Sequence, residues 1–151
     1  MTTIPGWHQL PDNPYNAHAW IIGEPAIGTG SWIGSFCVID GSGGLSIGDY
    51  CDISAGAQIY SHSTVRRCLS AGTQGVEQAS THIGSYCHIG AGAIILMGSL
   101  VEDHCVVAAG AIVTQFTHAP PYSLVIGAPA RVIQGGATEI LGSDDPRGNN
   151  G

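Results

Sequence analysis

The sequence contains no lysine, and its four basic residues are all arginine: Arg66, Arg67, Arg131 and Arg147. Against 11 acidic residues they leave a formal net charge of −7. General binding to nucleic acid needs clustered Lys and Arg side chains that neutralise phosphates, so this composition excludes that class of function. Only 10% of the residues are charged and 23 of the 151 are glycine, which favours a repetitive β-structure over a helical domain.

Long hydrophobic runs are also missing, so no membrane span is predicted, and the N-terminus does not resemble a secretory signal. The five cysteines include no Cys-x-x-Cys pair, which argues against a zinc or redox site built on cysteine. Four of them share one position of a repeat, where we expect them to act as small core residues, and Cys68 lies outside it. Together these features predict a cytoplasmic protein with reduced thiols.

What the sequence does have is Ile or Val at every sixth position. The series contains Ile27, Ile33, Ile39, Ile47, Ile53, Ile59, Val65, Ile83, Ile89, Ile95, Val101, Val107 and Val113. A two-residue slip at Gly43-Gly44 and a break after Val65 interrupt it. Four residues after most of these positions stands a small residue, and glycine often follows directly, as at Gly28, Gly48 and Gly90.

A period of six fits neither an α-helix nor a long flat strand. It predicts an all-β fold, a hexapeptide-repeat solenoid with three short strands per coil and the branched side chains turned inward. Glycine would then permit the backbone angles of the corners. Residues 1–20 are expected to cap the N-terminal end. Residues 21–133 form the solenoid, residues 66–82 an excursion loop, and residues 134–151 a flexible tail.

His62 is the leading candidate for chemistry because it lies just before the expected loop. A neutral imidazole can accept a proton from a hydroxyl or an amine at neutral pH, although a surface histidine with no role fits the position equally well. A metal site is not expected, because His82 and His88 occupy equivalent slots on successive faces and would point apart. Arg66, Arg67 and Arg131 are the candidate contacts for an anionic ligand.

The segments IGDYCDISAGAQIYSHSTV, IGSYCHIGAGAIILMGSLVEDHCVVAAGAIVT and PPYSLVIGAPARVI together resemble the hexapeptide-repeat acyltransferases. They look closest to the maltose/galactoside acetyltransferase-like sugar O-acetyltransferases, over about residues 21–133. The resemblance implies a left-handed parallel β-helix, whereas the usual crossover rule would predict a right-handed one. It also implies a homotrimer with sites between subunits, acetyl-CoA as donor, and a small sugar-containing acceptor, with no metal.

The resemblance further implies roles for individual residues. His62 matches the general base. The cofactor-binding positions are Ala91, Ala109, Gly110, Ala111, Thr114, Ala128 and Arg131, and the substrate-binding positions are Tyr60, Arg66, Arg67 and His88. His88 stands where the family often has Trp, and Ala91 stands where it has Ser. The acidic partner of His62 cannot be assigned from the sequence.

Two other functions remain open at this point. One is a γ-carbonic anhydrase-like metalloenzyme, which would need three converging histidines. The other is a trimeric scaffold that has kept the solenoid and lost catalysis. The leading hypothesis is an acetyl-CoA-dependent acyltransferase that acts on a hydroxyl of a sugar or sugar-containing small molecule.

Overall fold

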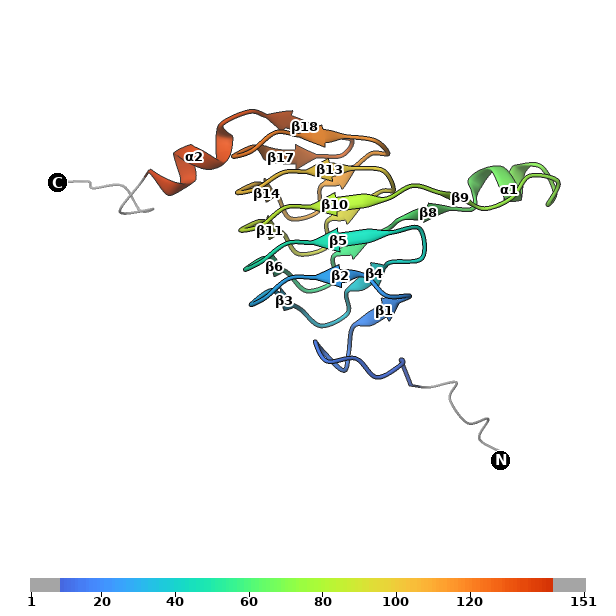
Figure 1. Ribbon diagram of the computed structural model, residues 1–151. Coiled ribbons are helices and arrows are strands. Elements are labelled where there is room, and N and C mark those ends of the chain that lie inside the picture. The colour runs from blue at the N-terminus through green and yellow to red at the C-terminus, as the bar shows by residue number, and fades with distance from the viewer. Residues whose placement is uncertain (1–8, 143–151) are drawn as a thin grey trace.

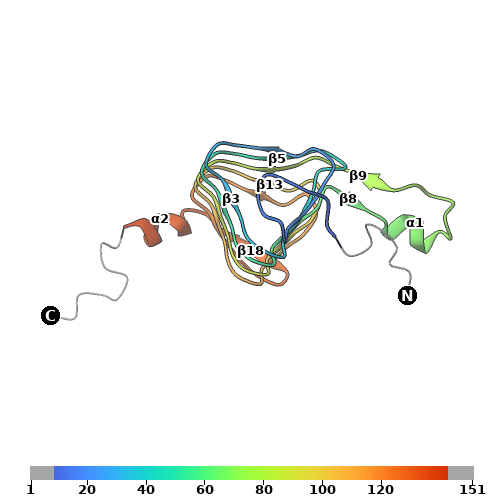
Figure 2. The same cartoon turned by 90° about the horizontal axis from the view of Figure 1, so that it is seen from below.

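The computed structural model describes residues 9–142 and shows a left-handed parallel β-helix with a triangular cross-section (Figures 1 and 2). Three sheets form the faces, with strand orders β1-β4-β7-β12-β15, β2-β5-β10-β13-β16 and β3-β6-β11-β14-β17-β18. We call them sheets A, B and C. All strand pairs within them are parallel except β17–β18, which is antiparallel. The predicted fold class and the left hand carried by the resemblance are confirmed.

The strands are short, as a period of six requires. Sheet A contains β1 (Trp20–Ile22), β4 (Val38–Asp40), β7 (Gln58–Ile59), β12 (Ile94–Ile95) and β15 (Ile112–Val113). Sheet B contains β2 (Ala26–Ile27), β5 (Leu45–Ile47), β10 (Thr81–Ile83), β13 (Leu100–Val101) and β16 (His118–Ala119). Sheet C contains β3 (Trp32–Ile33), β6 (Asp52–Ile53), β11 (His88–Ile89), β14 (Val106–Val107), β17 (Leu124–Gly127) and β18 (Ala130–Ile133).

The inward-facing residues of the sixfold series form the core. Ile33, Ile39, Ile47, Ile53, Ile59, Ile83, Ile89, Ile95, Val101, Val107 and Val113 are at most 3% exposed, and Ile27 packs against them half-buried. Each branched side chain therefore stacks on its equivalents in the coils above and below, and the free energy of their burial holds the coils together. Val65 is the exception: its side chain is 57% exposed, so the expectation that it occupies a core position is wrong.

The small residues of the repeat turn inward at the corners. Cys51, Cys87 and Cys105 are buried, and each thiol donates a hydrogen bond to a backbone carbonyl of the next coil, 3.0–3.1 Å away. This agrees with the prediction of small core residues and adds a bonding role. No disulfide links the cysteines in residues 9–142, and Cys68 is exposed.

The glycines that directly follow Ile do not adopt left-handed angles, contrary to the expectation. Gly28 and Gly90 are needed because the next coil approaches so closely that a Cβ would lie 2.3 Å from Asp49 Oδ1 and 2.4 Å from Ala109 N respectively. The left-handed positions come two residues later. At the corner between sheets B and C the first coil has Gly30 there, and the four later coils have rings: Tyr50, Tyr86, His104 and Tyr122, with φ of 52–62°.

These four rings stack on one another along the corner. The Tyr86 and His104 ring centroids are 4.9 Å apart, and those of His104 and Tyr122 are 4.6 Å apart, with nearly parallel planes. Tyr50 extends the ladder below Tyr86 at 5.9 Å. Left-handed angles cost a residue with a Cβ about 1–2 kcal/mol, and stacking offsets much of that cost.

One long excursion leaves the prism at the corner between sheets A and B (Figure 2). It contains β8 (His62–Ser63), α1 (Val65–Leu69) and β9 (Glu77–Gln78), and β8 pairs with β9 in antiparallel fashion. We call residues 62–79 the arm. It starts before the expected loop 66–82, because His62 already belongs to it, and it ends earlier, because Thr81 and His82 have returned to sheet B.

The two ends of the solenoid differ. At the N-terminal end, the Asn16 side chain donates to the Ile33 carbonyl at 3.1 Å, which ties the turn before β1 to the first coil. At the C-terminal end, α2 (Gly136–Leu141) leaves from another corner than the arm does (Figure 2). The first residues of the expected tail are thus helical, and residues 1–8 and 143–151 lie outside the described part. No helix within residues 9–142 is long and apolar enough to cross a membrane.

Candidate functional site

The arm leaves the solenoid through His62, and a buried carboxylate lies beside it. Asp40 ends β4, one coil below, and its Oδ2 is bonded to His62 Nδ1. The Asp40 side chain is fully buried, whereas that of His62 is 31% exposed. One ring nitrogen of His62 is therefore held inside the protein, and the ring still reaches the surface.

Asp40 is ionised because other donors converge on it. Burial alone would raise its pKa, but hydrogen bonds from Ser42, Ser61 and His62 outweigh burial and lower the pKa to about 2. Two of these bonds come from backbone amides: Ser42 N–H donates to Oδ1 and Ser61 N–H donates to Oδ2, both at 3.0 Å. An ionised carboxylate can only accept hydrogen bonds.

The protonation of the imidazole follows from this. Because Asp40 accepts, Nδ1 of His62 must carry the proton, and in the neutral ring Nε2 then holds the free lone pair. The Ser42 hydroxyl is also 3.4 Å from Nδ1. The arrangement presents a base with its tautomer set by the protein, which is the form that accepts a proton from a bound hydroxyl or amine.

Tyr60 flanks the imidazole from the same coil. Its ring meets that of His62 edge-on, with centroids 6.2 Å apart, and its hydroxyl donates to Gln58 Oε1 at 2.6 Å. Burial and then the negative charge of Asp40 raise the pKa of the Tyr60 hydroxyl, so it stays protonated at neutral pH. The structure thus places Tyr60 beside His62.

Five of the predicted cofactor positions lie at two corners of the prism. Four of them, Ala91, Ala109, Gly110 and Ala128, are exposed at the corner between sheets C and A, where Gly110 N–H donates to the Ala91 carbonyl at 2.9 Å. Thr114 is exposed at His62's corner, two coils further toward the C-terminus.

The other two cofactor positions differ from each other. Ala111 is fully buried, and its carbonyl accepts the Ile94 N–H, so its side chain is not available to a ligand. Arg131 is exposed on β18, opposite Ile126. A single chain therefore does not assemble these positions around His62.

His88 is exposed on the outer face of sheet C, between Asp52 and Val106, and not at the corner that holds His62. His82 lies on sheet B, where its Nδ1 is 2.7 Å from the Ser46 hydroxyl. The three histidines thus stand on different parts of the prism. Residues 9–142 contain no cluster of three or more His, Cys, Asp or Glu side chains suited to a metal ion.

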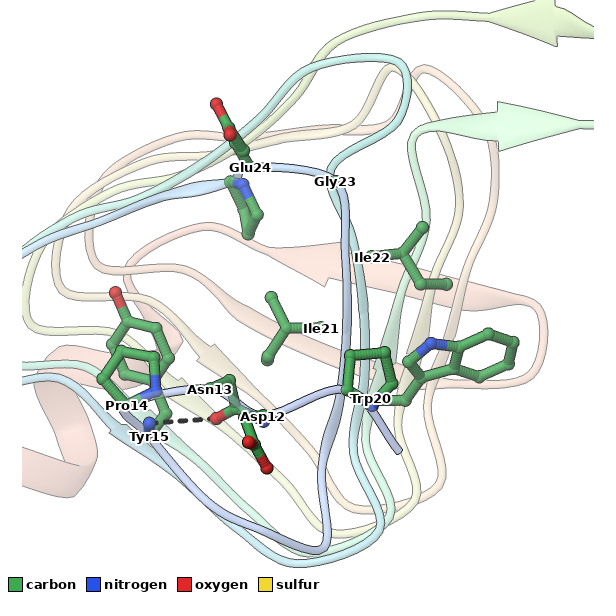
Figure 3. Close-up of a pocket in the computed structure, with 11 residues that line it drawn as sticks. Asp12, Asn13, Pro14, Tyr15, Trp20, Ile21, Ile22, Gly23 and Glu24 are labelled. Carbon is green, nitrogen blue, oxygen red and sulfur yellow. Dashed lines mark hydrogen bonds between the residues drawn. The ribbon is translucent and has the colours of Figure 1, made fainter. Parts of the chain in front are cut away.

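A hollow lies elsewhere, at the N-terminal end of the prism. It has a volume of about 550 Å³, and Figure 3 shows that Asp12 and Tyr15 from the N-terminal turn and Ile21 from the first coil line it. None of the predicted site residues borders it. It lies at the open end of the first coil.

Sequence reasoning missed Asp40, Ser42 and Ser61, which hold His62. A signal for Asp40 exists in the register. Ile39 pairs with Ile59, a shift of 20 residues that contains the two-residue slip, so Asp40 falls directly below the Tyr60–His62 segment. A count that includes the slip identifies the carboxylate.

Comparison with known proteins agrees with the fold. The family described as the hexapeptide repeat of succinyl-transferase matches residues 26–61 and 80–115. The two matched segments adjoin the arm and leave it out. Among curated proteins no match is found.

Several solved structures share the fold. An acetyltransferase with hexapeptide repeats from Vibrio cholerae is 30% identical with a TM-score of 0.62, over 73% of this chain and 61% of that one. A maltose O-acetyltransferase from Clostridium difficile 630 is 23% identical with a TM-score of 0.63, over 77% and 65%. AntD, an N-acyltransferase from Bacillus cereus solved with dTDP and 3-hydroxybutyryl-CoA, is 19% identical with a TM-score of 0.67, over 80% and 67%.

In its repeat and its fold this chain is similar to the hexapeptide-repeat acyltransferases, as the resemblance of its sequence indicated. The Vibrio cholerae protein has also been solved with acetyl coenzyme A. The chain spans 61–67% of the length of these three proteins, so their donors and acceptors do not transfer to it directly.

Proposed function

We propose that the protein transfers an acetyl group from acetyl-CoA to a hydroxyl of a sugar or sugar-containing small molecule, with His62 as general base. The observation that supports this most strongly is the bond between His62 Nδ1 and the buried, ionised Asp40. It leaves Nε2 as a base on the surface of an acyltransferase fold. An amine acceptor would use the same base.

The reaction needs one proton transfer in each direction. His62 Nε2 takes the proton of the acceptor hydroxyl while its oxygen attacks the thioester carbonyl carbon. The tetrahedral intermediate then collapses, its carbon–sulfur bond breaks, and the imidazolium returns the proton to the departing CoA thiolate. Asp40 keeps the ring oriented and stabilises its positive charge. No covalent bond between enzyme and acyl group is required.

We further propose that the active unit is a homotrimer. Within one prism, the candidate CoA positions Ala109, Gly110 and Ala128 occupy a different corner from His62. Two neighbouring prisms packed side by side would bring the two corners together, so that one subunit supplies the base and the next supplies the wall for CoA. Arg131 would then meet the CoA phosphates.

The test of the base is His62→Ala in an acetyl-transfer assay against a panel of sugars. We expect turnover to fall by a factor of roughly 10² to 10⁴ in a variant that still folds. Near wild-type turnover in a folded variant would contradict the role of His62.

The test of the shared site is subunit mixing. His62→Ala and Gly110→Trp are each expected to be inactive alone. If the site spans two subunits, random trimers of the two restore about one quarter of the wild-type sites. Mixed oligomers with no regained activity would argue that each chain carries a complete site.

A further inference from the structure

The arm carries an unusual share of the positive charge of this acidic protein. Two of its four arginines, Arg66 and Arg67, are adjacent in α1, within five residues of His62, while the whole chain has a net charge of −7. Figures 1 and 2 show the arm projecting from the prism, away from the acidic body. An anion approaching His62 would thus meet favourable charge on the arm.

A hollow of about 310 Å³ lies on the arm itself, lined by Arg66, Leu69, Ser70 and Gln74. The Arg66 guanidinium and the Gln74 side-chain amide can donate hydrogen bonds into it. The Ser70 hydroxyl instead holds the loop after α1 in shape, because it donates to the Arg67 carbonyl at 3.3 Å and accepts from Gln74 N–H at 2.9 Å. A concave surface with a guanidinium and a neutral amide donor suits an oxyanion such as a phosphate or a carboxylate.

Glu77 partly neutralises the positive charge of Arg66 at this hollow. Its Oε1 is 3.4 Å from Arg66 Nε, across the base of the arm. The contact occupies one edge of the guanidinium and leaves its terminal amino groups for another partner. Such a pair at the surface is weak, and Arg66 is 68% exposed, so a ligand with more than one anionic oxygen can compete with it.

We propose that the hollow on the arm binds an anionic group of the acceptor, a phosphate or carboxylate carried beyond the reacting hydroxyl or amine. This extends the proposed function, because it names the class of acceptor: a charged sugar rather than a neutral one. Arg66 is the residue that contacts the anion. Arg67 lies outside the lining and contributes only its long-range field.

The experiment measures equilibrium binding by calorimetry at low salt, so it needs no turnover. The ligands are matched sets of a neutral hexose, its 1-phosphate, its uronic acid and a nucleoside diphosphate derivative. Wild type is expected to bind at least one charged member about tenfold more tightly than the neutral hexose, and the preference shrinks in 1 M salt. Comparing the three charged ligands shows whether the hollow prefers a phosphate, a carboxylate or a nucleoside diphosphate.

Four variants locate the effect. Arg66→Gln should remove most of the tenfold preference, and Arg67→Gln, which makes the same change of charge one residue away, should retain most of it. Glu77→Gln should increase the preference, because it releases the edge of Arg66, whereas Glu139→Gln, equal in charge but on α2 at another corner of the prism, should not. Binding of the neutral hexose should be the same in all four.

Equal binding of charged and neutral members by wild type would overturn the proposal. So would an equal loss in Arg66→Gln and Arg67→Gln, because that result assigns the effect to general charge and not to the hollow. If the protein transfers no acyl group but binds the charged sugar through Arg66, then the proposed reaction fails and the anion site stands.

Discussion

Asp40→Asn is the substitution that most directly tests how His62 is held. The asparagine side chain has the same shape, but it places an amide in a pocket where Ser42 N–H, Ser61 N–H and His62 Nδ1–H all point at oxygen. One donor must then face another donor: Ser42 N–H if the amide nitrogen replaces Oδ1, or Ser61 N–H and His62 Nδ1–H if it replaces Oδ2. In the second orientation His62 moves its proton to Nε2 to accept from the amide, which removes the lone pair that serves as base.

The expected loss of stability follows from the pKa of Asp40, and the expected loss of turnover follows from the tautomer of His62. The pKa of Asp40 falls from 3.8 to about 2 on folding, which contributes about 2 kcal/mol to stability at neutral pH. The contribution is present above the unfolded pKa of 3.8 and is lost as the pH falls through about 2. Asp40→Asn should lower the free energy of unfolding by about this amount, and kcat by roughly 10²- to 10⁴-fold.

The assays are chemical unfolding at pH 7 and at pH 3, and acetyl transfer with the best acceptor. The difference in stability between wild type and Asp40→Asn should shrink at pH 3, because the wild-type carboxylate then loses its advantage. Asp52→Asn, on the exposed outer face of sheet C, is the matched control. A folded Asp40→Asn variant with wild-type kcat and an unchanged pH profile would refute the reasoning.

Two further predictions concern the solenoid. At the left-handed corner, Tyr86→Gly should cost less stability than Tyr86→Ala by about 1 kcal/mol, because both lose the stacked ring and only alanine keeps the strain at φ 58°; thermal melting in the opposite order would count against it. In the sixfold series, Ile89→Ala should destabilise by about 2–5 kcal/mol, whereas Val65→Ala should stay within about 0.5 kcal/mol, because only Ile89 is buried. A similar loss of unfolding free energy in the two variants would contradict the assignment of Ile89 to the core and of Val65 to the exposed arm.

The sequence predicts the prism well because its cause is local and repeated. Ile53 and Ile89 pair directly across β6 and β11. Both belong to the series of Ile and Val at every sixth position, which is visible in the sequence. The arm follows no period, and so its start at His62 and the exposure of Val65 were not predictable. The partner of His62 depends on a contact between coils 22 residues apart, which only the shifted register reveals.

The arm also divides the chain for folding. Coils on either side of it pair with a shift of 18 or 20 residues, as in Leu100–His118 and Ser31–Cys51, whereas pairs across it, such as Ser46–His82, are 36 apart. Doubling the length of a loop costs only about 0.6 kcal/mol of closure entropy, so the greater separation across the arm lowers the stability of the folded protein very little. Because pairs across the arm are the furthest apart in sequence, we expect the two stacks of coils to join late in folding. His62 begins the arm, so we expect the candidate base to gain its neighbours from the C-terminal coils only at that step.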